Sequence, residues 1–420
     1  VIPIIYAVDY FLKVGPRYLK DETIRPRLLF QKKSKICYEP YGVILIISPW
    51  NYPFGIPMGE IILALLCGNA VILKPSEYVD PVSRCIQSIF SSLDLPRNLF
   101  QVAYGDAALG AELVGHAGID KISFTGSTRA GQKILESAAH HITPCIMELG
   151  GKDAAIVLKD ADLKTTVSGI VWGGFTNAGQ VCGSIQRVYV HRSIVQPFVE
   201  AVVKQTENLK MVDDIASIVL PAQLDRYEAQ LKEALEKGAK ILIGGRRQSI
   251  QGRNYFEPTV LINVTDEMSI VKEETFGPFL PILMFDDEQE VISRVNHSPY
   301  GLCASIWTQN KQKGFRLAKK IEAATVTVND CLFTHAMCET PWGGYKYSGM
   351  GRVHGKWGFY EYCQVKHISV DRISLKPFWW FPYTAYSDQV AQELADHVAA
   401  DTKLDKIKTF FRFMMAYLFR

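Results

Sequence analysis

The nine cysteines of this 420-residue chain lack the paired spacing of a metal site, because no CxxC motif occurs among them. They are scattered through a long chain, which does not indicate the disulfide framework of a small secreted domain. The cysteine pattern therefore predicts no structural zinc and favours a reduced, cytoplasmic protein.

Low-complexity tracts and internal repeats are also missing, and charged residues make up only 21% of the chain. With 48% hydrophobic residues, the chain can fill the cores of two or three globular domains. The net charge is +3, and residues 403–420 alone carry an excess of +4. The remainder is close to neutral, which excludes an extended basic face for nucleic acid.

A signal peptide with a cleavage site is not visible, and the first residue is Val1 rather than methionine, so we expect a segment of a longer protein. Two uncharged runs, residues 40–59 and 168–186, reach the length that spans a bilayer. Prolines interrupt the first run, and Gly, Asn and Gln fill the second. Both runs are more typical of an enzyme interior than of a lipid-facing helix.

The first part of the chain alternates apolar strands with helices. After a helix over residues 1–18, the pattern predicts strands at 41–47, 69–73, 99–103 and 121–124 and helices at 56–67, 81–93, 107–116 and 129–139. Such alternation is typical of an α/β fold with a doubly wound parallel sheet, whose ligands bind beyond the carboxyl ends of the strands.

Two segments at predicted strand ends have the composition of a nucleotide site. In FTGSTRAG, Gly126 and Gly131 flank a turn that opens a helix, which suits a phosphate group but also a plain strand-to-helix turn. In LKPSE, Lys74 and Glu77 suit the hydroxyls of a ribose, and they equally suit an exposed pair at a helix start.

Two other segments carry candidate catalytic groups. Cys182 lies in NAGQVCGS between Gly179 and Gly183, where a substrate carbon could approach the sulfur; the alternative is a buried structural cysteine. Glu148 lies among apolar residues in MELGGKDA, so its carboxylate either turns outward or acquires a raised pKa that suits a general base.

Eight motifs then occur in a family order: PWNYP, LKPSE, FTGST, ELGGKDA, GQVC, EETFGP, PWGG and SGMG. Over residues 36–370 the chain resembles the NAD(P)-dependent aldehyde dehydrogenase superfamily. The segment SGMGRVHGKWGFYEY further resembles the short branch that includes fatty-aldehyde dehydrogenases.

The resemblance implies a Rossmann-type cofactor domain, an α/β catalytic domain and a small oligomerisation element that pairs subunits into a homodimer. The implied cofactor domain covers residues 1–147, with 28–43 in the oligomerisation element, and the catalytic domain covers 148–340. Residues 341–375 would return to the cofactor domain and the oligomerisation element, and 376–420 form a tail.

The resemblance also implies roles for single residues. Cys182 would be the nucleophile, Asn51 an oxyanion donor and Glu148 the general base for oxidation of an aldehyde to the acid through a thiohemiacetal and a thioester. The implied cofactor-binding residues are Ser48, Trp50, Lys74, Glu77, Gly105, Gly126, Ser127, Gly131, Leu149, Glu274 and Phe276. Because a carboxylate such as Glu77 on the ribose favours NAD over the 2′-phosphate of NADP, we expect NAD, with NADP as the alternative.

Two alternatives to hydrolytic aldehyde oxidation stay open at this point. A coenzyme A-acylating relative would keep Cys182 but typically lacks the glutamate found here as Glu148. A non-catalytic paralogue would be expected to have lost Cys182, Asn51 or Glu148, and all three are present.

The tail has an amphipathic pattern. After aromatic residues at 378–383, a helix is expected over 403–420, whose apolar face contains Ile407, Phe410, Phe411, Met414 and Leu418 and lies near basic residues. This helix suits either peripheral contact with a membrane or packing across a dimer or a substrate entrance. Together with the resemblance, the tail predicts a preference for medium- to long-chain apolar aldehydes.

Overall fold

The computed structural model describes residues 1–26, 29, 31–372 and 377–418. The chain forms two compact units, the first made of Val1–Lys20 and Tyr38–Lys366 and the second of Asp21–Cys37 and His367–Arg420. Parts of the expected layout lie outside the described residues: positions 28 and 30 of the oligomerisation element, the boundary at 375 and 376, and the last two residues of the tail helix.

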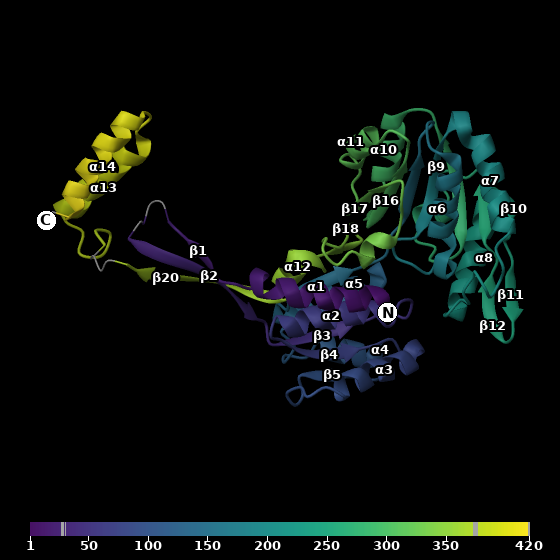
Figure 1. Ribbon diagram of the computed structural model, residues 1–420, viewed down its shortest axis with the longest axis horizontal. Helices are drawn as coiled ribbons and strands as arrows, with labels where there is room; N and C mark the ends of the chain where they lie inside the picture. The colour runs from purple at the N-terminus through teal and green to yellow at the C-terminus, as the bar shows by residue number, and fades with distance from the viewer. Residues whose placement is uncertain (27–28, 30, 373–376, 419–420) are drawn as a thin grey trace. The chain divides into compact units, whose positions relative to one another are not determined.

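A six-stranded sheet in the first unit has the order β19-β7-β6-β3-β4-β5. Its strands are β3 (Val43–Ile47), β4 (Ala70–Lys74), β5 (Phe100–Val102), β6 (Lys121–Thr125), β7 (Cys145–Glu148) and β19 (Gly349–Met350). All are parallel except β19, which runs antiparallel to β7. The helices of this part are α1 (Ile2–Tyr18), α2 (Gly55–Leu66), α3 (Asp80–Ser91), α4 (Ala107–Val114), α5 (Thr128–Ala138) and α12 (Gly355–Glu361) (Figure 1). The predicted alternation of strands and helices is confirmed.

The strand order reverses beside β3. The chain continues from β3 to β4 and β5 on one side, and then crosses to β6 and β7 on the other. Open α/β sheets bind their ligands at such a reversal, in the crevice beyond the carboxyl ends of the strands. In this chain the crevice is expected beyond the carboxyl ends of β3 and β6.

A second sheet has seven strands in the order β10-β13-β14-β9-β8-β16-β17. They are β8 (Asp153–Val157), β9 (Ile185–His191), β10 (Lys240–Ile243), β13 (Thr259–Ile262), β14 (Phe279–Phe285), β16 (Cys303–Trp307) and β17 (Thr325–Val328), and only β10 is antiparallel to its neighbour. Its helices are α6 (Leu163–Phe175), α7 (Val195–Glu207), α8 (Pro221–Glu236), α9 (Ser269–Lys272), α10 (Glu288–Asn296) and α11 (Lys311–Ala318). Short strand pairs complete this unit: β11 (Arg247–Ile250) with β12 (Arg253–Phe256), and β15 (Tyr300–Gly301) with β18 (Tyr345–Lys346).

Residues 149–152 connect the carboxyl end of β7 directly to the amino end of β8. The first sheet therefore presents its ligand-binding edge near the place where the second sheet begins. The predicted boundary between the cofactor domain and the catalytic domain, at residues 147 and 148, stays a prediction. The chain passes from the first sheet to the second just after this position.

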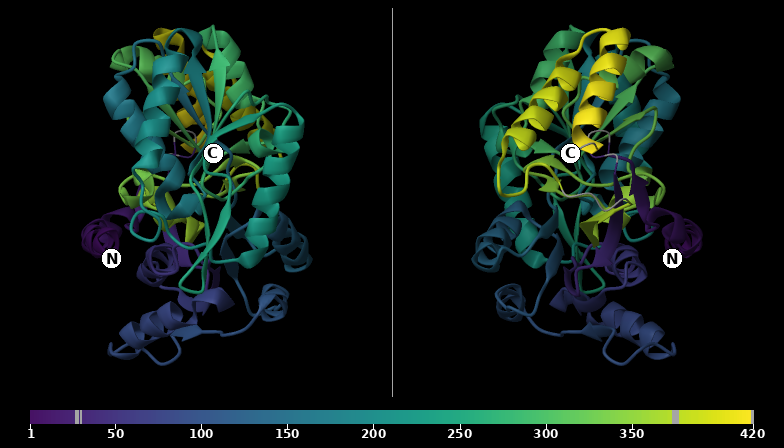
Figure 2. Two further views of the ribbon diagram at one scale, coloured as in Figure 1. Left: turned by 90° about the vertical axis from the view of Figure 1, so that its right-hand side faces the viewer. Right: turned by 90° about the vertical axis from the view of Figure 1, so that its left-hand side faces the viewer.

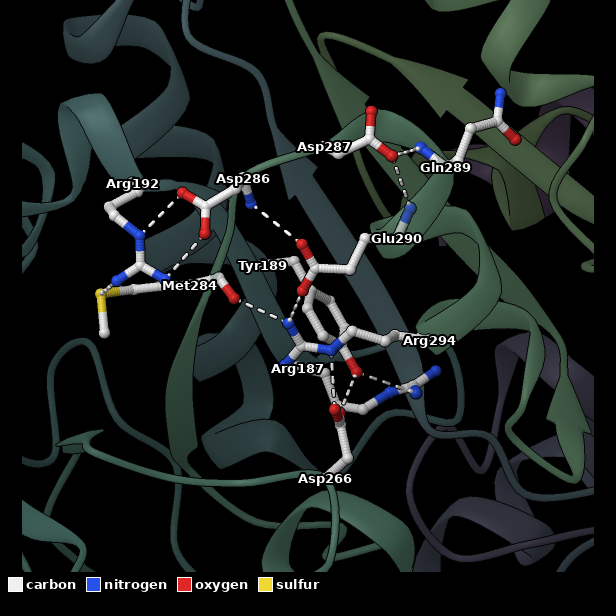
Figure 3. Close-up of polar contacts among 10 residues, drawn as sticks. All are labelled: Arg187, Tyr189, Arg192, Asp266, Met284, Asp286, Asp287, Gln289, Glu290 and Arg294. Carbon is white, nitrogen blue, oxygen red and sulfur yellow. Dashed lines mark hydrogen bonds and ion pairs between the residues drawn. The ribbon is translucent and has the colours of Figure 1, made fainter.

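A polar network links β9, in the middle of the second sheet, to α10 (Figure 3). Asp266 accepts hydrogen bonds from the hydroxyl of Tyr189 and from Nε of Arg294, both at 2.7 Å, and Arg294 also donates to Glu290 at 2.9 Å. Asp287 caps α10 by accepting from the amides of Gln289 and Glu290, the second and third residues of the helix. The network joins this helix to the sheet and lies outside the candidate site described below.

The second unit contains β1 (Glu22–Ile24), most of β20 (Cys363–Asp371) and part of β2 (Lys32–Pro40), which pair in the order β1-β2-β20. Two helices follow, α13 (Ala385–Ala399) and α14 (Lys403–Leu418), which lie side by side (Figures 1 and 2). The sequence predicted α14 but missed α13. Among the described residues, none of the helices is long and apolar enough to cross a membrane.

Close packing of α6 on the second sheet depends on Gly169. A Cβ at this position would lie 2.2 Å from Cη2 of the buried Trp307. We expect Gly169→Ala to lower the free energy of unfolding by about 1–3 kcal/mol, as overpacking typically does. Urea titration followed by circular dichroism measures this change. Gly55→Ala is the matched control, because a Cβ at Gly55 meets nothing within 4 Å, and equal stability of the two variants would contradict the assignment.

Candidate active site

A loop with unusual backbone geometry presents Cys182. Directly after α6, Asn177, Ala178 and Gly179 adopt left-handed conformations in succession, with φ of 49°, 54° and 71°. A Cβ on Gly179 would lie 2.1 Å from the carbonyl oxygen of Gly277, so only glycine fits there. The position of Cys182 therefore depends on the left-handed backbone of these three residues and on the glycine at position 179.

Hydrogen bonds join this loop to the PWNYP turn that follows β3. Nδ2 of Asn51 donates to the carbonyl oxygen of Gln180 at 3.0 Å, and Nδ2 of Asn177 donates to the carbonyl oxygen of Asn51 at 3.3 Å. The side chain of Gln180 donates to the carbonyl oxygen of Ser217 at 3.0 Å. The two predicted site segments, from different sheets, are thus brought together.

A cavity of about 470 Å³ opens onto Cys182 and Asn51. This volume is in the range of small-molecule sites. The rest of the lining is largely apolar or aromatic, and it includes Val1, Pro3, Ile4, Ala7, Tyr52, Pro53, Phe54, Ile56, Trp172, Val181, Leu332, Phe333, Ala336, Cys338 and Trp342, with His335 and His354 among its polar members.

Glu148 is the last residue of β7 and is buried, with 5% of its surface exposed. Its Oε2 accepts a hydrogen bond from Nε1 of Trp342 at 2.7 Å. Burial raises the pKa of Glu148 to about 8, against the opposing effect of the Trp342 bond. The carboxyl group therefore faces inward, and its pKa suits proton transfer near neutral pH.

Several predicted cofactor residues follow the carboxyl ends of adjacent parallel strands. They are Ser48 after β3, Lys74 at the end of β4, Gly105 after β5, Gly126 and Ser127 after β6, and Leu149 after β7. Lys74 is buried and lies 3.6 Å from Glu77, so the interpretation of an ordinary exposed pair is wrong for the lysine. Ser127 caps α5, and a Cβ on Gly131 would collide with the side chain of Leu149 at 2.5 Å.

Two further predicted residues come from the segment before β14. Oε1 of Glu274 accepts a hydrogen bond from the amide of Gly151 at 3.0 Å, and burial raises its pKa. Phe276 has a φ of 57° and contacts the ring of Trp50 edge to face, with centroids 5.5 Å apart. The EETFGP segment is thereby packed against ELGG and PWNYP, which the sequence alone did not establish.

Sequence reasoning missed other polar groups of the site. Lys152 is buried, and its Nζ donates to Thr275 at 2.9 Å and Gln186 at 3.2 Å; burial lowers its pKa well below the usual range. Asp153 accepts from the amide of Cys303 at 3.0 Å, and burial raises its pKa. Trp342 also escaped notice as a partner of Glu148. The PWGG motif contained the signal, but no local pattern pairs it with a residue about 190 positions earlier.

Comparison with known proteins identifies the family. The sequence model of the family described as 'Aldehyde dehydrogenase family' matches residues 1–368 of this chain. The chain belongs to the aldehyde dehydrogenase family.

Relatives support this membership. A 4,4'-diapolycopene aldehyde oxidase of Methylomonas is 38% identical over 92% of this chain and 73% of its own length. The human 4-trimethylaminobutyraldehyde dehydrogenase is 38% identical over 79% of this chain and 69% of its own.

Solved structures agree with the fold. The betaine aldehyde dehydrogenase of Staphylococcus aureus, in complex with NAD+, has a TM-score of 0.84 at 32% identity, covering 90% of this chain and 76% of that one. The lactaldehyde dehydrogenase of Escherichia coli has a TM-score of 0.84 at 35% identity, covering 88% of this chain and 78% of that one. The predicted α/β aldehyde dehydrogenase fold is confirmed.

The thiol of this aldehyde dehydrogenase is held protonated by its surroundings. Burial and then the carboxyl groups of Glu148, Asp153 and Glu274 raise the pKa of Cys182, and only the amide of Gly183 acts in the opposite direction. The thiolate is the nucleophilic form of a cysteine, so an attack by Cys182 on a substrate would require a base to remove the proton. Glu148 lines a cavity wall together with Cys182 and has a suitable pKa.

The environment of Glu148 predicts a pH dependence of this aldehyde dehydrogenase. A base works only when ionised, so kcat/KM should fall about tenfold per pH unit below a pKa near 8. Trp342→Phe removes a donor that stabilises the ionised form, and it should move this acid limb upward by about one pH unit. Rates of aldehyde oxidation between pH 5.5 and 9.5 measure the position of the acid limb and its shift. Trp172→Phe is the control, because Trp172 lies on the same cavity and does not donate the hydrogen bond to Glu148. Identical acid limbs in the two variants would contradict the role of Trp342.

Proposed function

We propose that the chain oxidises medium- to long-chain apolar aldehydes to carboxylic acids with NAD(P)+, through a thiohemiacetal and a thioester on Cys182. The observation that carries the proposal is the arrangement of Cys182 and Asn51 on an apolar cavity, with Glu148 behind the thiol. Membership of the short branch with fatty-aldehyde dehydrogenases is part of the proposal.

The side chains divide the chemistry among them. Sγ of Cys182 attacks the aldehyde carbon while its proton passes to Glu148. Nδ2 of Asn51 has two N–H groups, and the carbonyl oxygen of Gln180 takes one of them at 3.0 Å. The other N–H is available to the oxyanion that forms on the substrate, and one such donor typically contributes about 3–4 kcal/mol. After hydride transfer Glu148 releases the thiol proton to solvent, and in the second half of the reaction it takes a proton from the water that attacks the thioester.

The residues beyond the first sheet fit a dinucleotide. The hydroxyl of Ser48 is buried and has no hydrogen-bond partner among the described residues, at the strand reversal where such ligands bind. Gly126 and Ser127 would hold a pyrophosphate at the amino end of α5, and Lys74 with Glu77 would hold a ribose. A bound nicotinamide supplies the acceptor for the hydride. The carboxylate of Glu77 supports NAD as the preferred cofactor, with NADP as the alternative.

The cavity supports an apolar substrate. None of the described residues that line it is Asp, Glu, Lys or Arg, so a cationic substrate would find no counter-ion on the wall. Relatives are named for different aldehydes, among them diapolycopene aldehyde, betaine aldehyde and trimethylaminobutyraldehyde. The lining of this chain is therefore the better guide to its own substrate.

Substrate preference can be measured with a series of straight-chain aldehydes beside 4-trimethylaminobutyraldehyde. Each added methylene should raise kcat/KM by up to about fourfold until the cavity is filled, since a buried methylene contributes about 0.8 kcal/mol. The cationic aldehyde should react at least about 100-fold more slowly than octanal. Cys182→Ala is the inactive control, and higher kcat/KM for acetaldehyde or for the cation would contradict the proposal.

The same assay tests the alternatives. Free acid formed equally fast without coenzyme A supports hydrolysis, whereas a strict need for coenzyme A would identify an acylating enzyme. Folded protein without any NAD(P)H formation would identify a non-catalytic paralogue.

For location, we propose a cytoplasmic homodimer that makes peripheral contact with membranes. The described cysteines form no disulfide, which supports a reducing compartment. Ile368 and Val370 lie two residues apart on the same face of β20 and are exposed by 42% and 58%, and such an apolar strand surface supports pairing of two subunits.

The membrane proposal rests on α14. Its Phe413 and Tyr417 pack with Val390 of α13, which leaves much of the predicted apolar face exposed. Exposed apolar residues run along the helix at helical spacing: Leu404 (61%), Ile407 (56%), Phe411 (64%), Met415 (58%) and Leu418 (47%). Lys403, Lys406 and Lys408 accompany this stripe, which complements anionic lipid.

A triple variant, Leu404→Ser with Ile407→Ser and Phe411→Ser, tests the contact. The full chain should sediment with phosphatidylserine-containing vesicles and less with pure phosphatidylcholine, and the variant should partition at least about tenfold less. Val398→Ser, an exposed apolar residue of α13 at 66%, is the control. Equal sedimentation of the triple variant and the parent chain would exclude the membrane role, and a loss of native dimer mass instead would assign the stripe to the subunit interface.

A further inference from the structure

A second, small cavity lies behind Cys182. Its volume is about 20 Å³, and it is lined by Ile56, Glu60, Thr125, Glu148, Cys182, His335, Trp342, Val353 and His354. A cavity needs about 10–15 Å³ to hold one water, provided that two to four polar groups can bind it. The volume therefore suits a single water molecule.

Three buried polar atoms on this cavity have no hydrogen-bond partner among the described residues. They are Oε2 of Glu60, Oε1 of Glu148 and Nδ1 of His354. Leaving one such atom without a partner costs about 1–3 kcal/mol. Three of them around a space of one-water size indicate a water that binds to all three.

The two carboxyl groups are held in the same manner. Oε2 of Glu148 is fixed by Nε1 of Trp342 at 2.7 Å, and Oε1 of Glu60 by the hydroxyl of Thr125 at 3.3 Å. Each group thus has one oxygen bonded to protein and one without a protein partner. Glu60 lies on α2, only 4% exposed, among the apolar residues that fill the core beneath the first sheet.

We propose that Glu60 is a positioning residue for the hydrolytic step. It receives the proton of Glu148 through one water molecule that bridges the two carboxyl groups and His354. The inference rests on the proposed function, since it concerns the base of that reaction. Glu60 has no assigned role in the set predicted from the sequence.

The transfer balances without any further reactant. The attacking water gives one proton to the Glu148 carboxylate as its oxygen bonds to the thioester carbon. The bond to Sγ of Cys182 then breaks, and the second proton of that water passes to Sγ, so the product leaves as a carboxylate and Cys182 is again a thiol. Protonated Glu148 gives its proton to the bridging water, which gives one of its own to the Glu60 carboxylate. Glu148 is then ionised again. After the acid product leaves, the proton returns to solvent along the wall that His335, Trp342 and His354 share with the large cavity.

The ionisation behaviour of the groups agrees with this exchange. Burial raises the pKa of Glu60 to about 7 and that of Glu148 to about 8. Burial lowers the pKa of His335 to about 4 and that of His354 to about 3, so both rings stay neutral. The other titratable or charged groups that interact with the pair are Cys182, Cys303, Arg352 and Tyr362. One proton can therefore move between the carboxyl groups near neutral pH.

Glu60→Gln tests the proposal. Formation of the acyl-enzyme, followed as a burst of NAD(P)H, should stay within about twofold of the parent. Loss of the acyl adduct from Cys182, followed by intact mass, should slow by about tenfold or more, in line with the size of acid–base effects. The acid limb of kcat/KM should move to lower pH, because the charge of Glu60 is one cause that raises the pKa of Glu148.

Two comparison variants separate proton exchange from simple packing. Glu60→Asp keeps an acid and should recover part of the deacylation rate. If Glu60→Gln does not fold, the deacylation rate of Glu60→Asp relative to the parent is the test. Ile61→Val removes a methyl group from the buried neighbour of Glu60 on α2 but keeps the acid and its hydrogen bond, so it should deacylate nearly normally. Equal deacylation in parent and Glu60→Gln, equal slowing in Ile61→Val, or parallel loss of burst and deacylation would overturn the proposal. A parent chain that forms no NAD(P)H would instead refute the proposed function.

Discussion

The hydrogen bond from Trp342 to Glu148 inside an apolar pocket is the contact on which the site depends. It fixes one carboxyl oxygen at 2.7 Å and leaves the other without a protein partner beside Cys182. Burial raises the pKa of Glu148 to about 8, while the bond keeps the group ionisable near neutral pH. The pairing of Gly349 with Glu148 in the antiparallel strand brings the glycine-rich segment back to this point.

The thiol is adapted to the same constraint. Its pKa is raised by burial and by carboxyl groups, so Cys182 rests as a neutral thiol rather than as a reactive thiolate. A resting thiolate would be exposed to oxidation and to unrelated electrophiles. In the proposed reaction, deprotonation by Glu148 would confine the reactivity of Cys182 to a bound substrate, and the neutral histidines on the wall add no positive charge that would undo this.

The sequence predicted those elements whose signal is local. Four strands of the first sheet, β3 to β6, and the glycine-flanked position of Cys182 follow from apolar runs and glycines. The strands β7 and β19 were not predicted, and the direction of the Glu148 side chain was left open. The helix α13 was missed because it buries little, Ser387 and Val390 among its residues. The bond between Trp342 and Glu148 and the cavity at Glu60 depend on strand pairing across about 200 residues, which no window of sequence contains. The packing of Phe413 and Tyr417 of α14 against Val390 was not foreseen either, since α13 was missed.

The left-handed turn of Asn177, Ala178 and Gly179 has a consequence for how this chain can change. A residue other than glycine in that conformation costs about 1–2 kcal/mol, so the loop stores conformational energy that the folded core must offset. Selection for heat resistance alone would therefore favour substitutions that release residues 177 and 178 from the left-handed conformation, more than substitutions at most other positions. The relaxed variants would keep their fold but displace the nucleophile, so gains in thermal tolerance at positions 177 and 178 should come with a loss of turnover.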